Sequence, residues 1–173
     1  RITELDPNIF SILAIGLRNP SGIDIYEGRI YIADVGQDNY EEINIVDDWN
    51  KNFGWRAYEG RYPTMNKEGI VVYPKQVQSL QSLQSPQILE MPAVSYSYGS
   101  AVLGGKVIND KYVFADYGSR EDGFGMLFQI YNGEIQQIET GIDDKFTCIG
   151  SNLDRDVIYL GTKSGIIYKT SLL

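Results

Sequence analysis

Short runs of apolar residues, bounded by glycine, asparagine and aspartate, follow one another along most of the 173-residue chain. These runs are rich in isoleucine, valine and tyrosine, which favour β-strands over helices. Two-residue turn sequences, Asn109 with Asp110 and Asn132 with Gly133, separate neighbouring runs as in hairpins. We therefore expect an almost all-β chain with strands near residues 9–15, 22–26, 29–34, 41–46, 101–108, 111–117, 125–131, 134–139, 146–151, 156–162 and 165–171.

The expected strands recur as three similar modules, in residues 22–46, 101–138 and 148–172. Each module has a glycine-containing strand, a tight turn, an apolar strand that ends in a small residue plus Asp or Thr, and a third strand. Three such modules predict consecutive blades of a β-propeller. An ordinary meander or sandwich is the alternative, because any antiparallel protein contains hairpins.

The module boundaries predict one partial propeller domain over residues 1–173, with blades near 9–60, 92–140 and 141–173 and an inserted loop over about 61–91. Propellers use about four to eight blades, so three blades would leave open sheet edges that invite pairing. We expect an N-terminal propeller half or a second copy of the chain to complete the propeller. The chain, which does not begin with Met, is expected to be a fragment or a processed product.

The amino-acid composition excludes several classes of function. The chain carries 23 acidic and 15 basic side chains, a net charge of -8, which argues against a generic nucleic-acid binder. It contains no histidine, which excludes a Ser-His-Asp triad and histidine metal sites within it. The one cysteine, Cys148, excludes an internal disulfide and is expected to be a buried small hydrophobe. No apolar run approaches the length of about 20 residues that spans a bilayer.

Three motifs occur in a characteristic order: GLRNPSG at 16–22, DVGQDNYEEIN at 34–44 and NFGWRAYEG at 52–60. Together they resemble the glucose/sorbosone dehydrogenase family, PQQ-dependent quinoprotein sugar dehydrogenases whose propeller is shared with hedgehog-interacting-protein-like domains. The resemblance covers nearly the whole chain but only the C-terminal half of a family member. It implies an all-β fold with about three antiparallel, four-stranded blades of a six-bladed propeller.

The first motif offers a candidate cofactor site. Arg18 is a permanent cation with a planar fork that suits a carboxylate or quinone oxygen. Asn19 is biased toward an extended conformation because Pro20 follows it. The resemblance implies that Arg18 and Asn19 contact pyrroloquinoline quinone (PQQ). In the alternative, Arg18 pairs with a blade carboxylate and Asn19 caps a turn.

The second and third motifs suggest calcium, which prefers carbonyl and carboxylate oxygens. The resemblance implies that the carbonyls of Gly36 and Gln37 hold a calcium ion that touches the quinone. It further implies a second, structural calcium held by Glu42 and the carbonyl of Phe53. The alternative interpretation of Glu41 and Glu42 is a solvated strand edge.

Two family features are absent from the sequence. The family's catalytic base is a histidine in the N-terminal half, and no residue here matches it, so we assign no catalytic residue. Arginines that hold the quinone carboxylates in some members have no clear counterpart beyond Lys145. The resemblance thus implies part of a PQQ- and calcium-dependent sugar (aldose) dehydrogenase that is inactive by itself, with an extracellular or periplasmic location. The alternative is a non-catalytic propeller that serves as a binding or structural module, with a sugar as a possible ligand.

Overall fold

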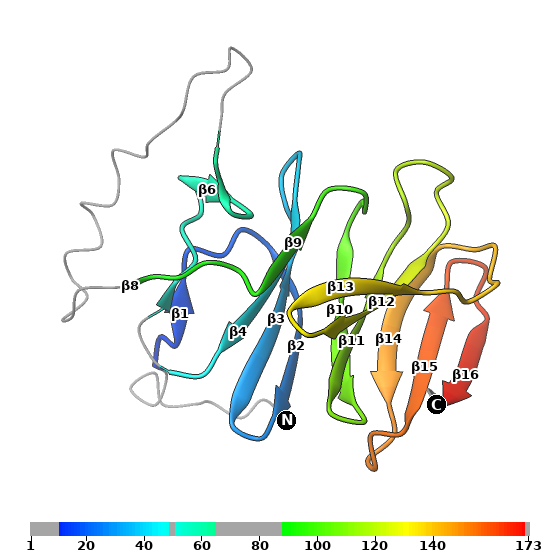
Figure 1. The fold of residues 1–173 in the computed structure, drawn as a ribbon. Helices are drawn as coiled ribbons and strands as arrows, with labels where there is room; N and C mark the ends of the chain where they lie inside the picture. The colour runs from blue at the N-terminus through cyan, green and yellow to red at the C-terminus, as the bar shows by residue number, and fades with distance from the viewer. Residues whose placement is uncertain (1–10, 49–50, 65–87, 172–173) are drawn as a thin grey trace, which may run out of the picture.

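The computed structural model describes residues 11–48, 51–64 and 88–171, and this part of the chain contains strands and no helix. Figure 1 shows three antiparallel sheets arranged side by side like blades. The first sheet has the order β2-β3-β4-β9, the second β10-β11-β12-β13 and the third β14-β15-β16. Their strands are β2 (Pro20–Tyr26), β3 (Arg29–Asp34), β4 (Glu41–Val46), β9 (Val94–Tyr96), β10 (Val102–Ile108), β11 (Lys111–Asp116), β12 (Met126–Tyr131), β13 (Glu134–Ile138), β14 (Phe146–Ser151), β15 (Val157–Thr162) and β16 (Ile167–Ser171).

Two small sheets lie beside the first blade. Strands β1 (Ala14–Ile15), β5 (Lys51–Asn52) and β8 (Ile88–Leu89) pair in parallel, and β6 (Tyr58–Glu59) pairs with β7 (Tyr62–Pro63). The expected all-β class is therefore confirmed, and the strands agree closely with those predicted from the apolar runs.

One strand of the first sheet comes from beyond the expected inserted loop. Strand β9, which lies within the blade expected over 92–140, pairs with β4 and so supplies the fourth strand of the first sheet. Of the strand expected over 9–15, residues 14–15 are strand, while residues 9–10 lie outside the described part. Most of the expected inserted loop, residues 65–87, also lies outside it. The sequence pattern misses the β4–β9 pairing because it joins segments on either side of this loop.

The first strand of each sheet carries a β-bulge at the same place. The register shifts between Pro20 and Gly22 in β2, between Val102 and Gly104 in β10, and between Phe146 and Cys148 in β14. A Cβ added to Gly22 would lie 2.7 Å from the Gly104 Cα, so β2 and β10 touch backbone to backbone. The shared bulge shows that the modules are structural repeats as well as sequence repeats.

The aspartate that ends the second strand of a module has a structural role. Asp34 accepts hydrogen bonds from the amides of Arg18 (2.9 Å) and Asn19 (2.6 Å), just before β2. Asp116 likewise accepts from the amides of Ser100 and Ala101, just before β10, at 3.0 and 3.2 Å. The carboxylate therefore fixes the chain where it enters the blade.

The core lies between the sheets. One buried cluster, which includes Ile43, Val107 and Phe128, joins the first two sheets, and a second, which includes Leu127 and Ile158, joins the second and third. The first sheet is also tied to the third by the buried side chain of Asp24, whose Oδ2 lies 2.7 Å from Nη1 of Arg155. The three blades thus pack as one structure.

The expectation that Cys148 is buried is wrong. Cys148 is a free, exposed cysteine on β14. Every residue from 163 to 171, including all of β16, is also exposed. No further sheet among the described residues covers this side of the third sheet.

Candidate functional site

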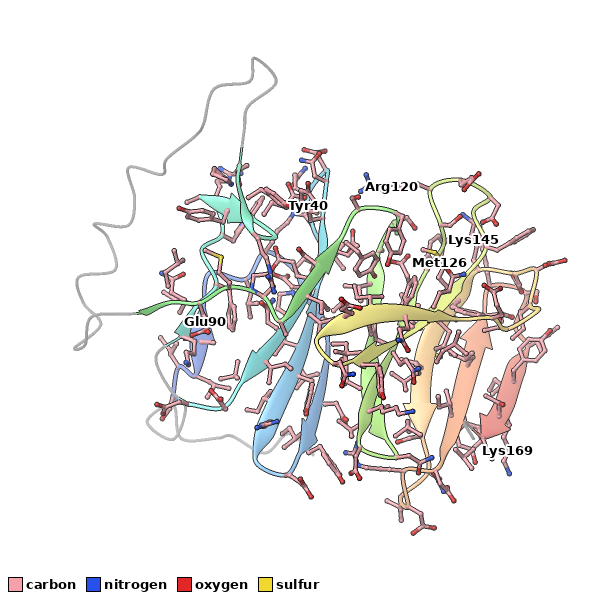
Figure 2. All side chains as sticks on the ribbon, viewed as in Figure 1. Tyr40, Glu90, Arg120, Met126, Lys145 and Lys169 are labelled. Atoms are coloured by element: carbon pink, nitrogen blue, oxygen red, sulfur yellow. The ribbon has the colours of Figure 1, made fainter. Side chains whose placement is uncertain are left out.

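The three sequence motifs meet at one end of the blades. The loop 35–40 joins β3 to β4 at this end, and the start of β2 lies beside it because Pro20 pairs with Asp34. Figure 2 shows Tyr40 and Arg120 at this end and Lys169 toward the opposite end. Loops of the first and second sheets therefore share one end of the molecule.

The structure brings Arg18 and Gln37 together. The Arg18 guanidinium donates from Nε and Nη2 to the Gln37 side-chain oxygen, at 3.0 and 2.8 Å, and from Nη1 to the Val35 carbonyl at 2.9 Å. It also lies 5.8 Å from the ring centroid of Trp55. Within the described ranges the Arg18 side chain forms no ion pair, which argues against the alternative pairing with a blade carboxylate.

Asn19 fixes the start of β2 through its backbone. Its amide donates to Asp34, and its carbonyl accepts from the Val35 amide at 3.1 Å. The residue itself is exposed, so its side chain lies at the surface beside Arg18. Burial raises the pKa of Asp34, and the amides of Arg18 and Asn19 offset only part of this effect.

Glu59, which the motif analysis did not single out, organises the loop that contains Gly36 and Gln37. Its Oε1 accepts hydrogen bonds from four consecutive backbone amides, those of residues 37–40, at 2.8–3.1 Å. Its Oε2 accepts from the Asn39 side chain at 3.3 Å. Burial alone would raise the pKa of Glu59, but these hydrogen bonds bring it below its ordinary value. Successive amides around one anion form a concave nest.

Glu42 is buried, so the alternative of a solvated strand edge is wrong for it and for its neighbour Glu41, which are 6% and 2% exposed. The Glu42 carboxylate accepts hydrogen bonds from the Gly60 amide and from the Asn44 side chain, the latter at 3.3 Å. Burial raises the pKa of Glu42 to about 7, and the nearby charges of Asp34 and Glu59 add to the rise. Glu42 is therefore a carboxylate whose negative charge is poorly compensated.

Asn44, also missed by the motif analysis, presents a further unsatisfied oxygen. The residue is fully buried, and its Oδ1 has no hydrogen-bond partner. Asn44 lies two positions after Glu42 on β4, on the same face of the strand. A buried oxygen without a donor beside a poorly compensated carboxylate suits a hard cation, so the residues present fit calcium.

Phe53 lies in a different environment. Its side chain is buried with Ile32 and Val46, and its amide donates to the Ile15 carbonyl at 2.9 Å. No hydrogen bond or hydrophobic cluster of the described residues joins Phe53 to Glu42. Nor do the described side chains contain a group of three or more Asp, Glu, His or Cys residues arranged to hold a metal. A cation here would therefore depend largely on carbonyl and amide oxygens.

Two other basic groups, Arg120 and Lys145, are engaged elsewhere. Arg120 donates from Nε to the Gly99 carbonyl at 2.7 Å, and the Lys145 ammonium lies 4.7 Å from the ring centroid of Tyr117. Arg18 is accordingly the cation most directly joined to the loop 35–40.

The described ranges contain no helical segment of the length and hydrophobicity needed to cross a bilayer.

No family model matches the chain. The HIPL1 protein of Arabidopsis thaliana is 45% identical over 60 residues, 33% of this chain and 8% of that protein. The HIPL2 protein of Arabidopsis thaliana is 46% identical over 54 residues, 30% of this chain and 8% of that protein. The chain therefore matches only a small part of these relatives.

Two solved structures share the fold over most of the chain. The PQQ-bound aldose sugar dehydrogenase from Streptomyces coelicolor matches with a TM-score of 0.59 and 18% identity, over 87% of this chain and 39% of that one. A glucose dehydrogenase matches with a TM-score of 0.62 and 16% identity, over 93% of this chain and 46% of that one. The chain spans less than half the length of either enzyme. Its fold is that of part of a sugar-dehydrogenase β-propeller, as the three motifs predict.

Proposed function

We propose that this chain is part of a PQQ- and calcium-dependent sugar (aldose) dehydrogenase-like propeller, in which it holds the cofactors and is not active by itself. The observation that carries the proposal is the contact between the Arg18 guanidinium and the loop that contains Gly36 and Gln37. This contact holds a permanent cation beside the half-buried Gly36 and the exposed Gln37, and one of the structural relatives is a PQQ-bound enzyme.

Each candidate residue has a role in this proposal. Arg18 would bind a carboxylate or quinone oxygen through its planar guanidinium group. Asn19 would contribute its side-chain amide. The carbonyls of Gly36 and Gln37 would hold the calcium next to the quinone. When bound, PQQ would supply the hydride acceptor for the sugar, and calcium would polarise the quinone. This chain's residues bind and orient these groups.

A second calcium would lie at Glu42, with Phe53 contributing its carbonyl. The unpartnered Oδ1 of Asn44 supports a cation at Glu42, since a buried oxygen without a donor is uncommon. A cation bound at Glu42 would also counteract the effect of burial, which raises the pKa of this carboxyl.

In this proposal the proton acceptor is a histidine supplied by another segment, because the sequence given contains none. We propose that an N-terminal propeller half or a second copy supplies the remaining blades. The exposed isoleucines on the outer sheets support this, with Ile23 58%, Ile25 61% and Ile167 74% exposed. An extracellular or periplasmic location is part of the same proposal.

The second candidate function is a non-catalytic propeller that binds a partner or a sugar. The absence of histidine and the lack of arginines near Lys145 favour it.

Titration of the chain with PQQ, followed by quinone absorbance with and without calcium, separates the two. The proposal predicts a calcium-dependent spectral change, with affinity about tenfold weaker in Arg18→Ala because a charged hydrogen-bond donor is lost. Arg29→Ala, an equal charge change at the hairpin end of the same strands, should have no effect. No calcium-dependent change in the unmodified chain would favour the non-catalytic function, and dye reduction with glucose by the pure chain would contradict its inactivity.

A further inference from the structure

The contacts of Glu59 determine where the carbonyls of the loop 36–40 point. The peptide bonds of this loop are trans, since the only cis bond in the described ranges joins Trp55 and Arg56. In a planar trans peptide the N–H of one residue and the carbonyl of the residue before it point in opposite directions. The direction of each amide therefore fixes the direction of the preceding carbonyl.

This rule applies directly to the two carbonyls proposed as cation ligands. The Gln37 amide points at Glu59 Oε1, at 2.9 Å, so the Gly36 carbonyl points away from Glu59. The Asp38 amide points at the same oxygen, at 2.9 Å, so the Gln37 carbonyl also points away. Neither carbonyl accepts a hydrogen bond from the described residues. Both oxygens are thus held outside the nest.

The loop has little freedom to rotate these carbonyls back. A Cβ on Gly36 would overlap the Tyr40 carbonyl oxygen and lie 2.9 Å from Glu59 Oε1, so the loop is closely packed around the carboxylate. On the other side Arg18 holds the Val35 carbonyl and the Gln37 side chain. The loop is fixed from both sides, by an anion at its amides and a cation at its flank.

We infer that Glu59 is a positioning residue, which gathers the amides of residues 37–40 so that the Gly36 and Gln37 carbonyl oxygens face a divalent cation. The inference rests on the proposed function for the identity of the ligand, but the orientation of the loop by Glu59 can be measured without any ligand. The negative charge is essential, because a neutral amide is a much weaker acceptor for four converging N–H groups.

The first experiment measures backbone hydrogen exchange in the calcium-free chain. In Glu59→Gln we expect exchange of the amides of residues 37–40 to accelerate about tenfold, the effect of losing charge-assisted hydrogen bonds. Asn39→Ala removes only the contact to Oε2 from an exposed residue, and should give a smaller acceleration in a variant that folds readily. Asp116→Asn, which alters an equally buried, amide-gathering carboxylate of the second sheet, is the matched control and should leave residues 37–40 unchanged.

The second experiment measures calcium binding to the same variants by calorimetry. Residues that orient metal ligands typically change metal affinity by about 10- to 100-fold, so we expect a loss in this range for Glu59→Gln and none for Asp116→Asn. Unchanged exchange at residues 37–40 in both Glu59→Gln and Asn39→Ala would overturn the positioning role, whatever the chain binds. Accelerated exchange without calcium binding by the unmodified chain would instead overturn the proposed cation site, and with it the function assigned to Glu59.

Discussion

The first and third sheets share the antiparallel order of their first three strands and the bulge in the first of these, yet they differ in what surrounds them. The first sheet has four strands and the buried carboxylates Asp34, Glu41 and Glu42. The third sheet has three strands, a threonine, Thr162, in place of the aspartate, and an exposed final strand. The two sheets therefore share a scaffold, but the buried carboxylates belong to the first sheet.

The largest expected effect comes from breaking the link between these sheets. Asp24 is 5% exposed and binds Arg155, Lys106 and the Val107 amide. Asp24→Ala should lower the free energy of unfolding by about 3 kcal/mol, because it leaves partly buried partners without an anion. Urea denaturation followed by circular dichroism measures this. The control, Glu90→Ala, breaks the more exposed Lys51–Glu90 ion pair and should lower the free energy of unfolding by less than about 1 kcal/mol. Equal losses of stability in the two variants would contradict the importance of the Asp24 link.

A second test compares how Glu42 in the first sheet and Asp144 beside the third sheet affect the stability of the chain as the pH changes. The folded-state pKa of Glu42 is raised to about 7 from 4.5, so the folded chain holds this proton more tightly than the unfolded chain. Its contribution to stability is complete below the unfolded pKa and is lost as pH rises from 4.5 to 7. In calcium-free buffer Glu42→Gln should therefore gain about 2 kcal/mol relative to the unmodified chain over this range.

The control for the pH test is Asp144→Asn. Hydrogen bonds from Ser164 and Thr162 lower the pKa of Asp144 to about 2, so its titration lies below this range. Between pH 4.5 and 7, the free energy of unfolding of Asp144→Asn should therefore change with pH in the same way as that of the unmodified chain. A parallel result for Glu42→Gln as well would show that the buried site is neutralised in another way.

The third test replaces the equivalent side chains at the ends of β11 and β15. Asp116 accepts hydrogen bonds from three amides and from the Tyr96 hydroxyl, the last at 2.7 Å. Thr162 has fewer contacts, including a hydrogen bond from its hydroxyl to the Ile166 carbonyl. Asp116→Asn should therefore destabilise the chain by about 1 kcal/mol more than Thr162→Val, measured by thermal and urea unfolding. A larger loss of stability in Thr162→Val would mean that the third sheet depends on the last residue of β15 more than the second sheet depends on the last residue of β11.

The smallest effect concerns Cys148. Because the thiol is exposed, it should react with a thiol reagent in the native chain at a rate within about tenfold of that in the unfolded chain. Cys148→Ser should change stability by less than about 0.5 kcal/mol. Strong protection that disappears on dilution would show that a second copy covers the third sheet, which would remove its contrast with the first.

The strands could be predicted from sequence because their determinants are local. Alternating apolar residues and two-residue turns fix β3, β11 and β15 almost to the residue. The β4–β9 pairing could not be predicted, since it joins segments separated by an insertion with no strand pattern of its own. The burial of Cys148 was misjudged for a related reason, because it depends on which neighbouring sheet is present.

The site was predictable in part. Resemblance to known motifs located Arg18 and Gln37, and the structure brings them within hydrogen-bond distance. Glu59 and Asn44 were missed because their roles arise from tertiary contacts: four amides that converge on one oxygen, and a buried oxygen left without a donor. The only signal in the sequence was a glutamate between tyrosine and glycine within the third motif, which is too weak to indicate a nest of amides.

The bond between Asp24 and Arg155 also has a consequence for synthesis. Its partners are separated by 131 positions, so a chain growing from the ribosome exposes Asp24 long before Arg155 is made. At typical elongation rates the interval is on the order of ten seconds, far longer than a hairpin needs to form. During this interval Asp24 has only Lys106 and the Val107 amide of β10 as partners, so the ionic link across the sheets is completed only after the third sheet has been synthesised.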